Sequence, residues 1–105
     1  MEKNVELSNI YDIYGAMLTE KQQELFELYY VSDLSLREIA QNKGISYQAV
    51  RDSIKSSELM LISFEKKVGM YKLKNDLKNM YDKCSNLSNE EDIKSCVIKT
   101  LKDII

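Results

Sequence analysis

One segment of the chain constrains its fold more than any other, because it has the pattern of two short helices joined by a tight turn. This segment, LSLREIAQNKGISYQAVRDSI, covers residues 34–54. Ser35 and Glu38 have the spacing of a capping box at the start of the first helix. Gly44 lies where a helix end needs a residue that accepts positive φ, and Ser46 can cap the second helix. The pattern predicts a helix-turn-helix; the alternative is an ordinary helical hairpin with a glycine cap.

The second helix of this motif is predicted to continue well past the turn. Its apolar positions alternate spacings of four and three, with Ser57 in one slot, as in a heptad seam. The seam consists of Val50, Ile54, Leu61, Phe64 and Val68. A helix of about 20 residues, about 30 Å long, has to bury its far half against the C-terminal helices or a second subunit. We therefore expect a homodimer whose interface includes Leu61, Phe64 and Val68.

The rest of the chain also has the composition and periodicity of helices. It contains no proline and three glycines, so the predicted fold class is all-α, with a long recognition helix and C-terminal helices. Further helices are expected at residues 5–18, 20–31, 71–84 and 89–105. Two more capping boxes are expected, at Thr19 with Gln22 and at Ser88 with Glu91.

The two C-terminal helices are each predicted to turn one apolar face inward. Those faces consist of Leu73, Leu77, Met80, Tyr81 and Cys84, and of Ile93, Val97, Leu101 and Ile104 or Ile105. A chain of 105 residues is expected to form a single domain, 1–105. Its helix-turn-helix part would span about 19–68, and its C-terminal helical extension about 70–105.

Charge is distributed unevenly along the chain, whose formal net charge is −2. Residues 1–31 carry two lysines against six acids, and residues 32–68 carry six basic residues against five acids. DNA-binding domains are usually basic. The small positive excess of the helix-turn-helix part therefore predicts DNA binding that is weak and very sensitive to salt.

Several classes of protein are disfavoured by what the sequence lacks. There is no histidine, so Cys84 and Cys96 make no Cys₂His₂ zinc site, and we expect them to be small, partly buried residues on the C-terminal helices. We find no nucleophile motif, phosphate-binding glycine loop or metal cluster, and therefore expect neither an enzyme nor a cofactor. No transmembrane run or signal peptide is recognisable, so we expect no membrane insertion and a cytoplasmic location.

Two motifs occur together in this chain, LYY-x-x-D-x-SL-x-EIA and QAV-x-D-x-IK, and the run LTEKQQELFELYY leads into the first. In combination they resemble region 4 of bacterial sigma factors. They resemble more closely the small YlxM-like helix-turn-helix proteins encoded beside the genes of the signal recognition particle. The residues that carry the resemblance are Leu18, Thr19, Lys21, Gln22, Leu28, Tyr29, Tyr30, Asp33, Ser35, Leu36, Glu38, Ile39, Ala40, Gln48, Ala49, Val50, Asp52, Ile54, Lys55, Glu58 and Leu61.

This resemblance implies an all-α fold with a sigma-region-4-like helix-turn-helix. It also implies a regulatory role in the signal recognition particle pathway, with components of that particle as partners. The family has an arginine directly after the serine that opens the recognition helix, where this chain has Tyr47. Ser56 follows Lys55 in place of a second basic residue. Two contacts with phosphate or guanine are therefore missing.

If the motif reads DNA, exposed residues at the start of the recognition helix make the contacts. Those residues are Ser46, Tyr47, Gln48, Arg51 and Lys55. Gln48 can pair with adenine and Arg51 with guanine, and Tyr47 can touch a phosphate or a thymine methyl group. Arg37 and Lys43 would contact the DNA backbone from the first helix and the turn. The alternative is that all of these are solvated surface residues.

Two function hypotheses therefore compete. The first is a DNA-binding regulator, favoured by the intact helix-turn-helix spacing. The second is an accessory factor that binds a protein or ribonucleoprotein and keeps the motif as a scaffold, favoured by the weak local charge and by Tyr47. A related choice concerns the tyrosines, which either stack on RNA or pack in the core at helical spacing. They are Tyr11, Tyr14, Tyr29 and Tyr30.

Overall fold

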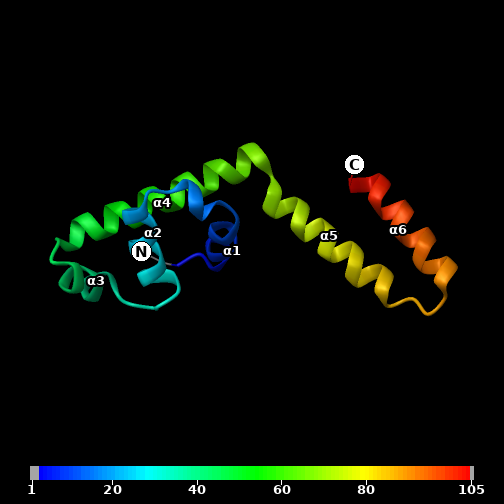
Figure 1. The fold of residues 1–105 in the computed structure, drawn as a ribbon, viewed down its shortest axis with the longest axis horizontal. Coiled ribbons are helices and arrows are strands. Elements are labelled where there is room, and N and C mark those ends of the chain that lie inside the picture. Colours follow the sequence, from blue (N-terminus) through cyan, green and yellow to red (C-terminus); the bar gives the residue numbers. More distant parts are fainter. Residues whose placement is uncertain (1–2, 105) are drawn as a thin grey trace. The chain divides into compact units, whose positions relative to one another are not determined.

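The computed structural model of the protein describes residues 3–104, which form six α-helices, one short 3₁₀-helix and no strand (Figure 1). The all-α prediction is confirmed. In chain order the elements are α1 (Val5–Tyr14), η1 (Gly15–Met17), α2 (Glu20–Tyr30), α3 (Leu36–Lys43), α4 (Tyr47–Val68), α5 (Met70–Ser85) and α6 (Glu90–Ile104).

The chain divides into two compact units between Val68 and Gly69. The N-terminal unit holds α1 to α4, and the C-terminal unit holds α5 and α6. This division lies between the two parts that the sequence predicts, the helix-turn-helix part and the C-terminal extension. The assignment of both parts to a single domain stays a prediction.

The core of the N-terminal unit is built around α4, against which α1, α2 and α3 all pack. Its fully buried apolar side chains, which come from α2, α3 and α4, are Leu25, Phe26, Ile39, Val50, Ile54 and Leu61. Ser57 occupies the polar slot of the heptad seam and is also fully buried. Its Oγ donates to the backbone carbonyl of Ser53 at 3.0 Å, so this polar group enters the core without losing its hydrogen bond.

Two of the three predicted capping boxes are confirmed. At the start of α2, the Gln22 N–H donates to Thr19 Oγ1 at 3.2 Å, and the Thr19 N–H donates to Gln22 Oε1 at 3.0 Å. At the start of α3, Ser35 and Glu38 make the same reciprocal pair, with both distances 3.1 Å. Each box satisfies two backbone donors that a helix start leaves without intrahelical partners.

The third predicted capping box is wrong. The side chain that caps α6 is Asn89, whose Oδ1 accepts from the Glu91 N–H at 2.8 Å. The helix therefore begins at Glu90, one residue later than expected. Ser88 and Asn89 are both good N-cap residues, so the sequence offered two adjacent candidates. The predicted last residue of this helix, Ile105, lies outside the described residues.

The first helix is shorter than predicted. α1 ends at Tyr14, and the chain continues as η1 before it becomes extended at Leu18, with φ −82° and ψ 158°. Thr19 is extended as well, because it is the N-cap of α2 and an N-cap residue has non-helical angles. Leu18, the last residue of the predicted helix, is buried from an extended segment instead.

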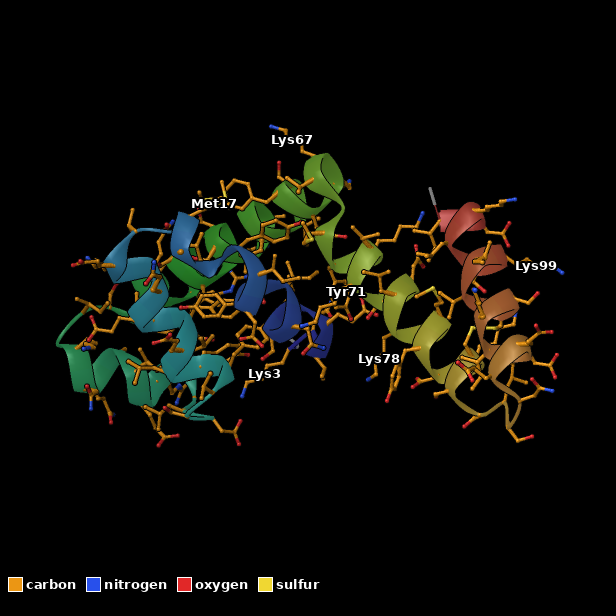
Figure 2. The ribbon with its side chains drawn as sticks, turned by 45° about the vertical axis from the view of Figure 1, so that its right-hand side comes forward. Lys3, Met17, Lys67, Tyr71, Lys78 and Lys99 are labelled. Carbon is orange, nitrogen blue, oxygen red and sulfur yellow. A yellow bond between two sulfur atoms is a disulfide. The ribbon has the colours of Figure 1, made fainter. Side chains whose placement is uncertain are left out.

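The C-terminal unit is a hairpin of α5 and α6, which pack on each other. Cys84 and Cys96, expected only to be small, partly buried residues, are joined by a disulfide with Cα atoms 5.6 Å apart (Figure 2). Within the described part of this unit, Cys84 is the one buried residue. Leu73, Leu77 and Tyr81, expected to face inward, are 39%, 41% and 69% exposed, so α6 does not cover the whole apolar face of α5. The disulfide therefore holds together a hairpin with little core of its own.

The apolar seam of α4 is used within the chain for most of its length. Val50, Ile54 and Leu61 are fully buried, and Leu61 therefore has no surface left for a second subunit. This corrects its assignment to a dimer interface, which overlooked that α1 covers the far half of α4. Phe64 is half-buried and packs against the ring of Tyr14, with centroids 6.2 Å apart. Val68 stays exposed at 60%.

Candidate nucleic-acid interface

The turn between α3 and α4 has the geometry that its sequence predicts. Gly44 has φ 66° and ψ 33°, and its N–H donates to the carbonyl of Ala40. Ile45 donates to the same carbonyl at 3.1 Å. A Cβ added at Gly44 would meet nothing within 4 Å. Glycine is therefore suited to this position by its left-handed backbone rather than by lack of space.

The start of α4 is fixed just after this turn. Ser46 Oγ accepts from the Ala49 N–H at 3.0 Å, which confirms Ser46 as a capping residue. Behind the turn, α3 and α4 share one buried cluster that includes Ile39, Ala40 and Val50. Small and β-branched side chains at these positions let the two helices cross closely. The packed side of the motif is therefore rigid, and the opposite side of α4 faces solvent.

The exposed side of α4 carries the residues predicted to read DNA. Ser46, Tyr47, Gln48 and Lys55 are exposed, and Arg51 is half-buried. Tyr47 keeps 46% of its surface in solvent. Gln48 and Lys55 lie on the side of α4 opposite the buried Val50 and Ile54, Arg51 lies on its flank, and Tyr47 lies in the first turn on the side of Val50. Of the predicted recognition residues, Gln48 and Lys55 therefore share one exposed face of α4, with Arg51 beside it.

One recognition residue already has a partner on the same helix. Gln48 Nε2 donates to Asp52 Oδ1 at 2.9 Å. The two residues are four apart, the spacing at which helix side chains meet. From the sequence, Gln48 was expected to contact a base directly, and its pairing with Asp52 was not predicted, although their spacing of four residues is the signal for such a pair.

The two predicted backbone contacts differ in their surroundings. Arg37 is exposed on the first turn of α3. Lys43, at the end of α3, forms an ion pair with Glu24 of α2. A lysine held by a carboxylate has less to offer a phosphate, because the two anions compete for the same ammonium group. The structure thus leaves Arg37 in solvent and gives Lys43 an internal partner.

Tyrosine–glutamate hydrogen bonds fix the long helix that carries this surface. The Tyr14 hydroxyl donates to Glu65 at 2.7 Å, and the Tyr30 hydroxyl donates to Glu58. Both acceptors lie on α4, and both donors lie on the helices that cover it. Burial and the Glu58 hydrogen bond raise the pKa of the Tyr30 hydroxyl. These bonds join residues 28 or more positions apart, so sequence spacing gave no signal for them.

The aromatic side chains of α1 and α2 pack in the protein rather than forming an open stacking platform. Tyr11 stacks on Phe26 with centroids 4.4 Å apart, and Phe26 stacks on Tyr30 at 4.3 Å. Tyr14 and Tyr29 are buried. This arrangement supports the core-packing interpretation over stacking on RNA, because the ring faces are already covered.

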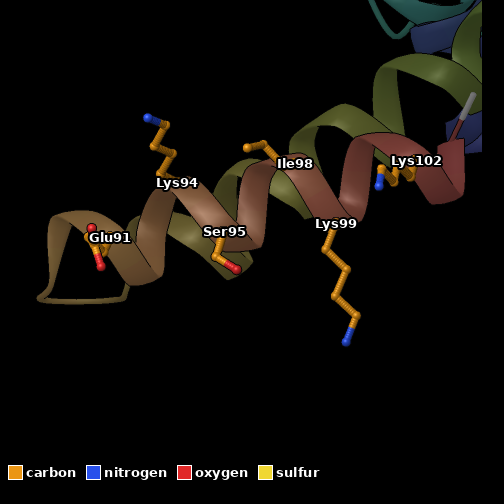
Figure 3. Close-up of a pocket in the computed structure, with 6 residues that line it drawn as sticks. All are labelled: Glu91, Lys94, Ser95, Ile98, Lys99 and Lys102. Atoms are coloured by element: carbon orange, nitrogen blue, oxygen red, sulfur yellow. The ribbon is translucent and has the colours of Figure 1, made fainter.

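The exposed face of α6 in the C-terminal unit does not gather its polar groups toward one point. A shallow pocket there is lined by α6 residues alone, and the ammonium groups of Lys94 and Lys99 point away from each other (Figure 3). A site that binds one ligand needs polar groups that converge. Between residues 3 and 104 we also find no cluster of residues that could hold a metal ion, and no helix long and apolar enough to cross a membrane.

Fold and surface together define a helix-turn-helix protein with a second helix of 22 residues, whose exposed start carries polar and basic side chains. A family of such proteins matches residues 1–104 of the chain, UPF0122, described as "Putative helix-turn-helix protein, YlxM / p13 like". The chain belongs to this family, and the resemblance found in the sequence is confirmed.

Several relatives support this membership. The UPF0122 protein YlxM of Bacillus subtilis (strain 168) is 36% identical over 107 residues, which cover 99% of this chain and 97% of that protein. A UPF0122 protein of Mycoplasma capricolum is 42% identical over 105 residues, covering 100% and 90%. A UPF0122 protein of Thermoanaerobacter sp. (strain X514) is 47% identical over 74 residues, 70% of this chain and 63% of that protein. The match to this last relative spans less than two thirds of its length.

Proposed function

We propose that the protein is a non-enzymatic regulator that binds duplex DNA in the cytoplasm through the start of α4. The observation that carries this proposal is the turn geometry around Gly44 and Ser46. It leaves Gln48 and Lys55 exposed on the side of α4 opposite the buried Val50 and Ile54, and Tyr47 exposed in the first turn. A helix presented in this way fits the major groove, where its N-terminal residues meet base edges.

Each exposed residue has a distinct chemical role in this proposal. The Arg51 guanidinium can donate two hydrogen bonds to guanine, and the Gln48 amide can pair with adenine. Lys55 lies one helical turn beyond Arg51 and would contact phosphate. Arg37 on α3 would contact the opposite backbone. Base contacts of this kind give sequence preference, whereas phosphate contacts give affinity without preference.

The charge of the N-terminal unit sets the expected strength of binding. Residues 1–68 carry eight basic and eleven acidic residues, and Lys43 is already paired with Glu24. Few phosphate contacts are therefore available, and each one contributes about one unit to the salt dependence of binding. We expect affinity that is measurable at low salt and falls as salt is added.

The experiment that tests this function is a fluorescence-anisotropy titration with a pool of randomised duplexes at low salt. Arg51→Ala should weaken binding to preferred sequences by about 1–3 kcal/mol. Lys55→Ala should weaken all sequences alike and lower the salt slope by about one. Lys21→Ala is the matched control, because Lys21 is exposed on α2, outside the motif. Wild-type binding no stronger than that of the Arg51→Ala, Lys55→Ala double variant would contradict the proposal.

The second candidate function is an accessory factor that binds a protein or a ribonucleoprotein. The acidic excess of the N-terminal unit and the ion pair of Lys43 with Glu24 favour it, because both reduce attraction to phosphate. Components of the signal recognition particle are the candidate partners that the family resemblance implies. A pull-down from native cytoplasm, with and without nuclease, separates the two functions. Recovery of those components after nuclease treatment would favour the accessory role.

A further inference from the structure

Asp52 is a carboxylate placed in the middle of a surface that is proposed to meet DNA. It is exposed on α4, next to Arg51 and one turn after Gln48. Asp52 also lines one end of a shallow surface hollow, whose other lining residues, Lys55, Ser56 and Leu59 among them, lie farther along α4. A carboxylate repels phosphate and is an acceptor only. If this face meets DNA, Asp52 therefore has to face groups that donate hydrogen bonds.

The hydrogen bond between Gln48 and Asp52 fixes the orientation of the Gln48 side-chain amide. Nε2 donates to Asp52 Oδ1 at 2.9 Å. The reverse orientation would place the amide carbonyl against the carboxylate, with two acceptors facing each other. Because Oε1 lies across the amide carbon from Nε2, the bond turns this carbonyl away from Asp52. One N–H of the amide and the carbonyl stay available for a base.

That pair of groups matches one base in particular. Adenine presents the N7 acceptor and the N6 amino donor in the major groove. The remaining N–H of Gln48 suits N7, and Oε1 suits N6. A freely rotating glutamine would have to order its amide on binding, and ordering a side chain costs free energy. Asp52 reduces this cost by holding the amide before DNA arrives.

The second carboxylate oxygen, Oδ2, has its own preference. In the major groove, cytosine N4 and adenine N6 are amino groups that can donate a hydrogen bond to a carboxylate. Guanine and thymine present acceptors there, which cannot pair with a carboxylate. An unpaired carboxylate opposite those acceptors would be desolvated without compensation. Asp52 therefore disfavours guanine and thymine at the position it faces.

We propose that Asp52 is a specificity-determining residue of the DNA-reading surface. It orients Gln48 for adenine, and its own carboxylate accepts from the amino group of a neighbouring cytosine or adenine. This inference rests on the proposed DNA binding. Its cost is a lower affinity for every sequence, because the charge of Asp52 repels the phosphates on both sides of the groove.

The test compares wild type with Asp52→Asn on duplexes in which each base of a preferred site is varied in turn. Asparagine has the same shape and can still accept from Gln48, but it has no charge and can also donate. We expect Asp52→Asn to bind non-preferred duplexes more tightly, and to lose roughly tenfold discrimination against guanine or thymine at one position. Gln48→Ala should lose preference for adenine at the adjacent position.

Asp12→Asn is the matched control, since it removes the same charge from an exposed position on α1. It should leave base preference unchanged, and circular dichroism should show all variants folded. If wild type prefers certain bases and Asp52→Asn keeps the same preference, the inference is overturned while the proposed function stands. Wild-type binding without any base preference overturns the inference together with the base contacts assigned to Gln48 and Arg51, and leaves duplex binding itself standing. Wild type that binds no duplex at all overturns both.

Discussion

Lys43, the last residue of α3, forms an ion pair with Glu24 of α2. The lysine side chain retains 31% of its surface in solvent and the glutamate retains 53%. An exposed pair of this kind contributes about 0–1 kcal/mol to stability. The ion pair matters more for DNA binding, because it engages the ammonium group of Lys43 at the edge of the helix-turn-helix.

Removing the acidic partner should release that cation for DNA. We predict that Glu24→Gln binds duplex DNA more tightly than wild type at low salt and increases the salt slope by about one. Lys43→Ala should change affinity little in the wild type and lower it in the Glu24→Gln background. Anisotropy titrations of the four proteins, which form a double-mutant cycle, measure this coupling. Equal effects of Lys43→Ala in both backgrounds would show that Glu24 does not restrain Lys43.

Because Leu61 is fully buried, truncating its side chain should destabilise the N-terminal unit. Leu61→Ala should lower the free energy of unfolding by about 2–5 kcal/mol, because it leaves a cavity beside fully buried neighbours. Leu59→Ala is the control, since Leu59 lies on the same helix and is 61% exposed. It should change the free energy by no more than about 0.5 kcal/mol. Urea unfolding followed by circular dichroism checks both values, and similar effects of the two substitutions would place Leu61 outside the core.

The homodimer expected from the α4 seam stays a prediction. Leu61 has no surface for it, whereas Val68 is 60% exposed at the end of the same helix. Light scattering of the wild type should give the mass of two chains. Val68→Asp should shift that mass toward one chain without unfolding the protein, because the side chain is exposed. A wild-type mass of one chain would contradict the dimer.

The features predicted best from sequence are those that residues within one turn decide. The boxes at Thr19 and Ser35, the glycine at the turn and the Ser46 cap all depend on neighbours up to four positions away. Their hydrogen bonds form wherever the backbone enters or leaves a helix. The helix-turn-helix was therefore predictable, and so was the exposed start of its second helix, opposite the buried Val50.

The features missed are those that depend on which helices meet in space. The sequence did not pair Lys43 with Glu24, 19 positions away, nor Tyr14 with Glu65, 51 positions away. Leu61 was assigned to a dimer because periodicity shows which face of a helix is apolar but not what covers it. Tyr81 is a second example: its spacing places it on the apolar face of α5, but α6 does not cover that part of the face.

The disulfide predicts how the C-terminal unit responds to reduction. Cross-linking Cys84 to Cys96, 12 residues apart, should stabilise the hairpin by about 3 kcal/mol. Since Cys84 is the one buried residue in the described part of this unit, a thiol reductant should lower helicity there while α1 to α4 stay folded. Hydrogen exchange in oxidised and reduced protein measures this difference, with Cys84→Ser, Cys96→Ser as the control that reductant no longer affects. Unchanged exchange in α5 and α6 would show that the hairpin does not need the disulfide.

Alkaline pH should destabilise the N-terminal unit through its tyrosines. Burial, and then the hydrogen bond to Glu27, raise the pKa of Tyr11 from 10.0 to about 12. A raised pKa in the folded state means that the neutral phenol stabilises the fold fully below pH 10, and that this stability is lost as pH rises toward 12. Tyr11→Phe should flatten that decline. Unfolding free energies measured across this range test it, and identical slopes for the two proteins would contradict the assignment.

The central claim, that the start of α4 is a DNA-reading surface, is tested most directly by amide chemical shifts. Isotope-labelled protein is titrated with a duplex selected from the random pool at low salt. We predict that the largest shift changes fall on residues 44–55, on either side of Arg51, with smaller changes near Arg37. No shift changes, or changes confined to residues of the C-terminal unit, would contradict the account.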